Sequence, residues 1–174
     1  MITRRGFGFA AAAGFLASGY GRSTARAQTV VPDGSTIVLV RHAEKKEGDG
    51  DVPLIPAGQA RAEALSETLR GAGISSIITT KALRTQQTAK PLAKLLQITA
   101  IPVERSDVEQ TVLAKLPGAV LVVGHSDSVP DLVRDFGGPH LDEIRDYDNL
   151  FIIIRANGMT RFIHSRYGAP SPSP

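Results

Sequence analysis

The sequence predicts an α/β fold, a three-layer α/β/α sandwich whose sheet is mostly parallel and ends in a C-terminal antiparallel hairpin. Two observations favour this fold. Runs of β-branched residues alternate with helical patterns along the chain, which is typical of consecutive βαβ units. Near the end of the chain, the dipeptide Asn157-Gly158 separates two apolar segments, and this pair of residues is a strong signal for a tight hairpin turn.

Six segments are expected to form strands. The first four are continuous apolar runs, of the kind that a parallel sheet buries on both faces. The last two flank the Asn157-Gly158 turn and are expected to pair with each other. In chain order the segments are 36–40, 74–79, 98–103, 119–123, 150–154 and 160–165.

Three helices are expected between these strands, at 57–70, 86–96 and 108–116. In the first, the apolar positions form a stripe that would face the sheet: Ala57, Ala60, Ala64, Leu65 and Leu69. Ser106 and Glu109 have the spacing of a capping box, so we expect them to cap the third helix. This role would explain Glu109 without any part in chemistry.

Residues 1–27 resemble a twin-arginine signal peptide. Arg4 and Arg5 precede a short alanine-rich apolar run, and Ala25-Arg26-Ala27 has the pattern of a cleavage site. The apolar run is shorter than the roughly 20 residues that span a bilayer, so no stable membrane anchor is expected. The sequence therefore predicts export in a bacterium, to the periplasm or the medium.

Removing residues 1–27 from the 174 leaves 147, which is enough for one domain, expected over 28–167. The removed segment holds four arginines and no acid, so the formal charge of +3 becomes −1 and gives no support for binding nucleic acid. The chain has no cysteine, which excludes disulfides and a thiolate nucleophile. Residues 168–174 alternate Pro and Ser and are expected to form a disordered tail.

Two arginines and two histidines follow three of the predicted strands. Arg41 and His42 come directly after the first strand, Arg84 opens the helix after the second, and His125 ends the fourth. The carboxyl ends of parallel strands share one edge of the sheet, where ligands bind in such folds. Guanidinium groups match the shape and charge of a phosphoryl group, and helix N-termini after Arg84 or His125 would add N–H donors. A phosphorylated ligand is therefore expected at this edge.

A neutral imidazole is a competent nucleophile near pH 7. His42 is expected to attack phosphorus and form a phosphohistidine, which water then hydrolyses, although the sequence does not show which ring nitrogen attacks. The positive field of the arginines favours the neutral form of His42. His125 would donate hydrogen bonds to the oxygens as charge builds up in the transition state. This chemistry requires no metal and no cofactor.

Five segments of the chain resemble motifs of the histidine phosphatase superfamily, also called phosphoglycerate mutase-like, and in particular its small members without an insertion domain. They are, in order, VRHAEK at 40–45, LIPAG at 54–58, LRTQQTAKPLA at 83–93, VVGHSDSVP at 122–130 and YDNLF at 147–151. The resemblance implies a phosphatase in which His42 is the nucleophile and Arg41, Arg84 and His125 bind the phosphoryl group. A mutase, which the family also contains, would need a phosphate donor, and the small size and export argue against it.

The sequence departs from the family at two positions. Ile55 stands where the family usually has threonine, so the following helix lacks a hydroxyl cap. Many members have an acid that protonates the leaving group, either after the third strand or directly after the second histidine, where this chain has Ser126. Glu104, at the end of the third predicted strand, is therefore the expected general acid.

Two other functions remain open from the sequence. Gly124 to Ser128 (GHSDS) is one residue short of a GxSxG nucleophile elbow, which would make Ser126 the nucleophile of an esterase, but this leaves Arg41 and Arg84 unexplained. A non-catalytic periplasmic module could bind phosphorylated ligands in the same pocket. The rim of the expected pocket is short, so the partner is either a small phosphorylated substrate or a phosphoprotein.

Overall fold

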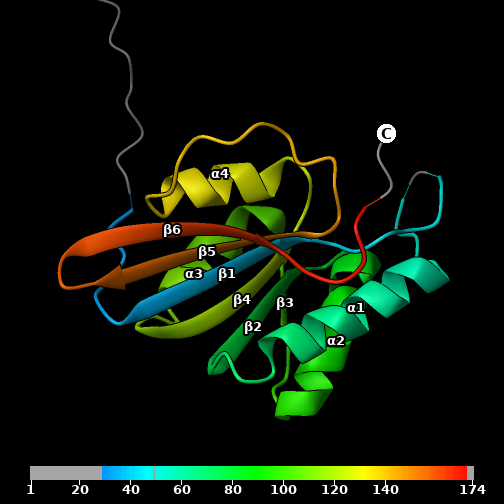
Figure 1. Cartoon of the computed structure of the whole chain (residues 1–174), viewed down its shortest axis with the longest axis horizontal. Coiled ribbons are helices and arrows are strands. Elements are labelled where there is room, and N and C mark those ends of the chain that lie inside the picture. The colour runs from blue at the N-terminus through cyan, green and yellow to red at the C-terminus, as the bar shows by residue number, and fades with distance from the viewer. Residues whose placement is uncertain (1–28, 49, 172–174) are drawn as a thin grey trace, which may run out of the picture.

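The computed structural model describes residues 29–48 and 50–171, so the predicted signal segment 1–27 lies outside the described residues. Six strands form one sheet with helices on both faces, as predicted (Figure 1). In chain order the elements are β1 (Ser35–Arg41), α1 (Pro56–Leu69), β2 (Ile74–Thr80), α2 (Leu83–Leu96), β3 (Ile101–Val103), a 3₁₀ turn (Arg105–Asp107), α3 (Val108–Leu113), β4 (Gly118–Gly124), α4 (Ser128–Asp135), β5 (Asn149–Ala156) and β6 (Met159–Arg166).

The sheet is mixed and has the strand order β3-β2-β4-β1-β5-β6. β1, β2, β3 and β4 pair in parallel, whereas β5 is antiparallel to β1 and β6 is antiparallel to β5. Asn157 and Gly158 both have positive φ, at 52° and 72°, as a two-residue turn between twisted strands requires. The predicted C-terminal hairpin is confirmed.

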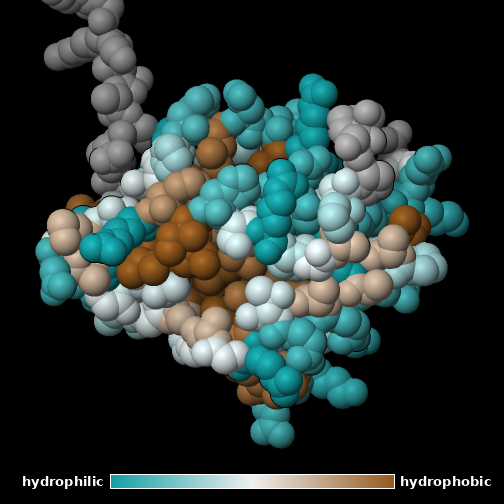
Figure 2. All heavy atoms as spheres, in the orientation of Figure 1, coloured by the Kyte–Doolittle hydropathy of each residue, from teal (hydrophilic) through white to brown (hydrophobic). Residues whose placement is uncertain are grey.

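Two apolar cores lie on opposite faces of the sheet, because successive side chains of a strand point to opposite sides. On β1, Ile37 and Leu39 pack against α3 and α4, whereas Val38 and Val40 pack against α1 and α2. Figure 2 shows apolar side chains over β5, β1 and β4, in the part of the viewed face that α1 and α2 do not cover. Each middle strand is thus buried on both faces, which explains its continuous apolar sequence.

Several predicted elements have other boundaries or roles. β3 begins at Ile101 and α3 ends at Leu113, so both are shorter than predicted. The expected capping box is wrong: Ser106 donates to the Asp107 carboxylate, α3 has no side-chain cap, and Glu109 accepts from the Thr29 hydroxyl. The Ser106 side chain therefore does not cap α3.

The predicted stripe of α1 is also partly wrong. Leu65 and Leu69 are buried, but Ala57 and Ala60 are exposed, and Arg61 lies on the buried face instead. No helix in the described part of the chain is long and apolar enough to cross a bilayer.

The segment after β6 is held by hydrogen bonds, contrary to the expected disorder of residues 168–174. Ser171 Oγ lies 2.7 Å from the backbone nitrogen of Tyr147, and Ala169 O accepts from Arg61 Nη1 at 2.8 Å. Residues 172–174 lie outside the described residues. The expectation of disorder is therefore wrong for Gly168 to Ser171.

Candidate active site

The register of the sheet brings the two histidines together. Arg41, the last residue of β1, pairs with Gly124, the last residue of β4, in the parallel ladder. The next residue of each strand therefore leaves the sheet at the same edge, and His42 N donates to Gly124 O at 2.9 Å. The ring centroids of His42 and His125 lie 5.5 Å apart, with the rings at 69° to each other.

His42 is held in one tautomer. Its Nδ1 atom lies 2.8 Å from the carbonyl oxygen of Ala43, and a carbonyl only accepts hydrogen bonds, so Nδ1 carries the proton. The Nε2 lone pair is therefore left for chemistry. The residue is only 4% exposed, and burial together with the charges of Arg41 and Arg84 lowers its pKa to about 3, against the hydrogen bond to Ala43.

His125 is bound through both ring nitrogens. Arg84 Nη2 lies 3.3 Å from Nδ1, and a guanidinium only donates, so Nδ1 is the acceptor and Nε2 carries the proton. Nε2 then donates to Thr80 Oγ1 at 3.0 Å. Burial, followed by the charges of Arg84 and Arg105, lowers the pKa of His125 to about 4. Both imidazoles are therefore neutral near pH 7.

Arg41 holds the segment 144–147 against the site. Its Nη1 donates to Ile144 O at 3.0 Å and also to Arg145 O, and its Nη2 donates to the Tyr147 hydroxyl at 3.3 Å. The guanidinium carbon lies 4.1 Å from the centroid of the Tyr147 ring, which is 6.0 Å from the ring of His42. Tyr147 is thus a neighbour of His42. From the sequence, Tyr147 is recognisable only as part of the YDNLF motif.

Two buried donors of the site have no partner among the described residues: Arg41 Nε and Arg84 Nε. A buried N–H without an acceptor is costly, so such donors are usually paired with a ligand or water. Arg84 Nη1 donates to Gly50 O at 3.4 Å, in the loop that also carries Asp51. The two Nε–H groups are suited to donate hydrogen bonds to a bound anion.

The first N–H groups of the neighbouring helices have partners of their own. Asp51 Oδ1 accepts from Leu83 N at 2.5 Å, at the start of α2, and Asp127 Oδ1 accepts from Ser128 N at 2.8 Å, at the start of α4. These two N–H groups are therefore not free to bind a ligand. The side chains of the site therefore provide most of the positive charge.

Glu104, the expected general acid, lies outside this hydrogen-bonded group. Its carboxylate is bound to Lys81 Nζ at 2.6 Å, and both side chains are 62% exposed. None of the hydrogen bonds among the described residues connects Glu104 to the two histidines. Its role as an acid stays a prediction that the geometry does not test.

Ser126 has a different partner from the one that an esterase needs. Its hydroxyl donates to Glu143 Oε1 at 2.9 Å, and within the described ranges no hydrogen bond joins it to a histidine. The backbone of Ile144 also donates to Ser126 O, at 2.9 Å. The arrangement lacks the serine–histidine contact on which the esterase reading depends.

A buried ion pair holds the loop that follows His42. Arg61 Nη2 lies 2.6 Å from Glu44 Oε1, and the two side chains are 4% and 12% exposed. A Cβ atom at Gly58 would lie 2.1 Å from Glu44 O, so only glycine allows α1 to approach this closely. Neither Arg61 nor its contact with Glu44 was predicted, because an arginine in an alanine-rich helix suggests an exposed position.

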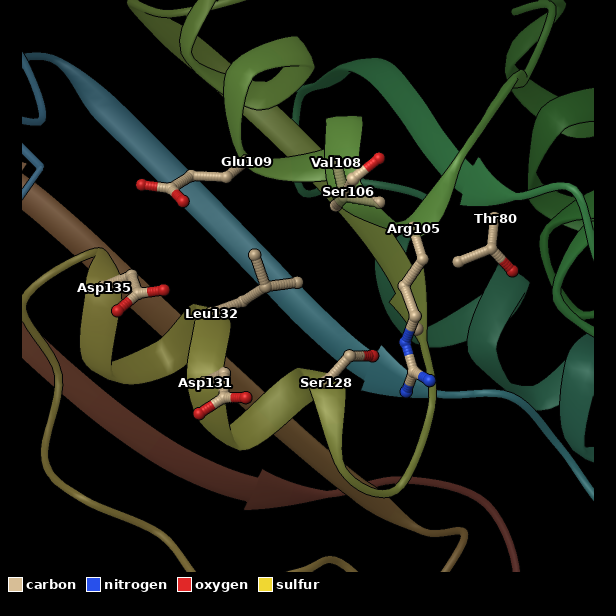
Figure 3. Close-up of a pocket in the computed structure, with 10 residues that line it drawn as sticks. Thr80, Arg105, Ser106, Val108, Glu109, Ser128, Asp131, Leu132 and Asp135 are labelled. Atoms are coloured by element: carbon tan, nitrogen blue, oxygen red, sulfur yellow. The ribbon is translucent and has the colours of Figure 1, made fainter.

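A cavity of about 330 Å³ adjoins the site on the α3–α4 side of the sheet (Figure 3). Thr80, Gly124 and Ser128 line the end near His125, and Arg105 lies between Thr80 and Ser128. The Arg105 guanidinium is ion-paired with Asp127. Three acids line the other part of the cavity: Glu109, Asp131 and Asp135. The cavity thus adjoins Thr80, which is hydrogen-bonded to His125.

Comparison with known proteins identifies the fold and the motifs. Residues 37–107 match the family model of the histidine phosphatase superfamily, branch 1. The chain is 39% identical over 64 residues to the probable phosphoglycerate mutase GpmB of Yersinia enterocolitica, a match that covers 33% of this chain and 30% of that protein's length.

Two solved structures share the fold. The protein histidine phosphatase SixA, complexed with tungstate, has a TM-score of 0.62 at 18% identity, over 75% of this chain and 96% of the other. The mycobacterial glucosyl-3-phosphoglycerate phosphatase Rv2419c, complexed with inorganic phosphate, has a TM-score of 0.58 at 15% identity, over 78% and 98% of the two chains. The matched segment 37–107 contains Arg41, His42 and Arg84, and the shared fold places His125 beside them. Residues 37–107 thus match the histidine phosphatase superfamily, and the fold is that of the SixA structure.

Proposed function

We propose that this protein is a phosphatase that hydrolyses a phosphomonoester or a phosphohistidine through a covalent phosphohistidine on His42. The observation that carries the proposal is the hydrogen bond from His42 Nδ1 to Ala43 O, at 2.8 Å. It orients the ring and leaves Nε2 as the nucleophile, in a buried setting where Arg41 and Arg84 keep the imidazole neutral.

The reaction has two displacement steps. His42 Nε2 forms a bond to phosphorus while the bond from phosphorus to the leaving group breaks, and the leaving group takes the electron pair. Water then attacks the phosphohistidine, the N–P bond breaks with its electrons returning to Nε2, and inorganic phosphate leaves. Both steps pass through a transition state whose negative charge lies on the phosphoryl oxygens, where cationic groups stabilise it.

The charges of the site support binding of a phosphoryl group. Arg41 and Arg84 each direct an unpaired, buried Nε–H, and Arg105 adds a third positive charge near His125. When Arg84 turns from Nδ1 of His125 to the anion, the ring proton is free to shift from Nε2 to Nδ1. Nδ1 then donates to the phosphoryl group. Structures of the two similar proteins contain tungstate or phosphate, both tetrahedral oxyanions.

The physiological substrate would be a small phosphorylated compound or a phosphoprotein. The similar structures belong to a protein histidine phosphatase and to a phosphatase of a phosphorylated sugar derivative, so both classes occur with this fold. The export predicted from residues 1–27 would place the reaction in the periplasm or outside the cell. The non-catalytic alternative predicts binding of the same ligands without turnover.

Steady-state hydrolysis of p-nitrophenyl phosphate by the purified protein tests the proposal. We expect turnover by the wild type, loss of at least 1000-fold in H42A, and wild-type turnover in the control H140N, which changes an exposed histidine. Stoichiometric phosphate binding without turnover would instead establish the binding module. Hydrolysis of p-nitrophenyl acetate that depends on Ser126 and survives H42A would establish the esterase.

A further inference from the structure

Neither histidine of the site presents a free proton to a leaving group. Both rings are neutral with their protons engaged, on Nδ1 of His42 by Ala43 O and on Nε2 of His125 by Thr80. Departure of an alcohol from phosphorus requires a proton, whereas a phosphohistidine or an anhydride leaves more easily. The source of this proton therefore decides which substrate class the site can use.

One segment of the chain crosses the site from one histidine to the other. At one end, Tyr147 contacts Arg41 and lies beside the ring of His42. At the other end, Ile144 N and the Glu143 carboxylate are both hydrogen-bonded to Ser126, the residue that follows His125. Three hydrogen bonds thus fix the backbone of this segment, two from Arg41 to Ile144 O and Arg145 O and one from Ile144 N to Ser126 O.

Glu143 lies at the end of the segment that is far from His42. In a displacement at phosphorus the leaving group departs roughly opposite the nucleophile, so it moves away from His42. Glu143 Oε1 accepts from Ser126 Oγ at 2.9 Å, so the carboxyl group is bound to the residue that follows His125, and the Glu143 side chain is exposed. We propose that Glu143, positioned by Ser126, is the proton donor to the leaving group and that the substrate is a phosphomonoester of an alcohol.

This inference rests on the proposed phosphatase function and completes its proton balance. As the P–O bond breaks, the Glu143 carboxyl proton moves to the leaving oxygen and an alcohol is released. The resulting carboxylate then takes a proton from the water that attacks the phosphohistidine, which restores the acid as phosphate leaves. Glu143 would thus act as an acid in the first step and as a base in the second.

Glu143 has a better position than Glu104 for this role. Glu104 is bound to Lys81, and its described hydrogen bonds do not lead to either histidine. Glu143 is joined to the His125 loop directly through Ser126 and to the His42 side through Ile144 and Arg41. The two assignments therefore predict opposite effects of the E143Q and E104Q substitutions on activity.

The dependence of the rate on the leaving group distinguishes them. We would measure kcat/KM for p-nitrophenyl phosphate, whose leaving group needs no proton, and for an alkyl ester such as glycerol phosphate. E143Q is expected to lower kcat/KM for the alkyl ester by 10²- to 10³-fold and for the nitrophenyl ester by less than about threefold. E104Q and the neighbouring exposed control D142N are expected to change both values by less than about threefold.

S126A tests the positioning role separately. Loss of the hydroxyl is expected to lower kcat/KM for the alkyl ester by about tenfold, through kcat more than through KM. The kcat/KM for the nitrophenyl ester should change little. Equal losses on both esters in E143Q, no loss, or a selective loss in E104Q would overturn the assignment to Glu143. A wild type that cleaves neither ester would overturn the proposed function itself, whereas activity that depends on His42 but not on Glu143 overturns only this inference.

Discussion

Thr80 Oγ1 lies 3.0 Å from Nε2 of His125, and this hydrogen bond joins the ends of β2 and β4 at the centre of the site. The same hydroxyl lies 3.0 Å from Thr85 Oγ1, in the first turn of α2. Thr80 is 5% exposed, so the bond is shielded from water. It fixes the orientation of His125, whereas the Arg84 guanidinium at Nδ1 determines that Nε2 carries the proton.

Replacing Thr80 should therefore impair catalysis, although Thr80 itself does not contact the substrate. T80V leaves the buried Nε2–H without its acceptor, and an unsatisfied buried donor costs about 1–3 kcal/mol. We expect a fall in kcat of about 10- to 100-fold on p-nitrophenyl phosphate, with KM changed less. T80S keeps the hydroxyl and should retain most of the activity, so equal activity in wild type, T80V and T80S would show that the bond has no catalytic role.

The two histidines should show opposite tautomers in solution. Because Nδ1 of His42 donates to Ala43 O and Nδ1 of His125 accepts from Arg84, imidazole ¹⁵N NMR should detect the proton on Nδ1 of His42 and on Nε2 of His125. Both rings should stay neutral at pH 6, since their pKa values are lowered to about 3 and about 4. A ring that titrates near pH 6.5 would contradict this environment.

Acid should destabilise the fold through His42. In the unfolded chain this side chain has its ordinary pKa of 6.5, whereas burial and the neighbouring arginines lower the pKa to about 3 in the folded protein. Between these values the unfolded state binds more protons, so the free energy of unfolding falls as the pH falls from 6.5 towards 3. Urea unfolding at several pH values should show a shallower fall in H42N, and an unchanged slope would contradict the lowered pKa of His42.

Breaking the buried ion pair between Arg61 and Glu44, in the loop that follows His42, should strongly destabilise the protein. R61A leaves the Glu44 carboxylate buried without its main partner, for which a loss of about 3–5 kcal/mol in the free energy of unfolding is typical. The exposed pair between Arg70 and Glu67 provides a matched control, because R70A should cost at most about 1 kcal/mol. Similar midpoints of urea unfolding for R61A and R70A would refute the role given to Arg61.

The close approach of α1 to the loop after His42 gives a further test. In G58A the new Cβ atom would lie 2.1 Å from Glu44 O, so the helix or the loop must move. We expect both lower stability and at least a tenfold lower kcat/KM on p-nitrophenyl phosphate, because the loop carries His42. At Gly71 an added Cβ meets nothing within 4 Å, and G71A should leave activity unchanged.

The strands and the arrangement of the site were largely predictable from the sequence. Apolar runs mark the middle strands because both faces of each are buried, and Arg41, His42, Arg84 and His125 all follow such runs. Parallel pairing then requires their side chains to share one edge of the sheet. This argument needs only local patterns and the rule for ligand sites in parallel sheets.

The supporting contacts were not predictable in the same way. Arg41 binds the carbonyl of Ile144, more than a hundred residues away in the chain, and Ser126 meets Glu143 in a segment without regular structure. Arg61 is buried only because Glu44 and the C-terminal segment surround it with acceptors. Such contacts depend on the packed structure, and a sequence pattern alone predicts an exposed side chain for Arg61.

Trapping the phosphorylated protein tests the covalent mechanism most directly. Rapid acid-free quenching during turnover, followed by mass spectrometry of the peptides and ³¹P NMR, identifies the modified atom. Phosphate on Nε2 of His42, labile to acid and absent from H42N, is the predicted result, because Nδ1 is bound to Ala43 O. Phosphate on Nδ1, on His125 or on Ser126, or rapid turnover without any phosphorylated residue, would contradict nucleophilic attack by His42 Nε2.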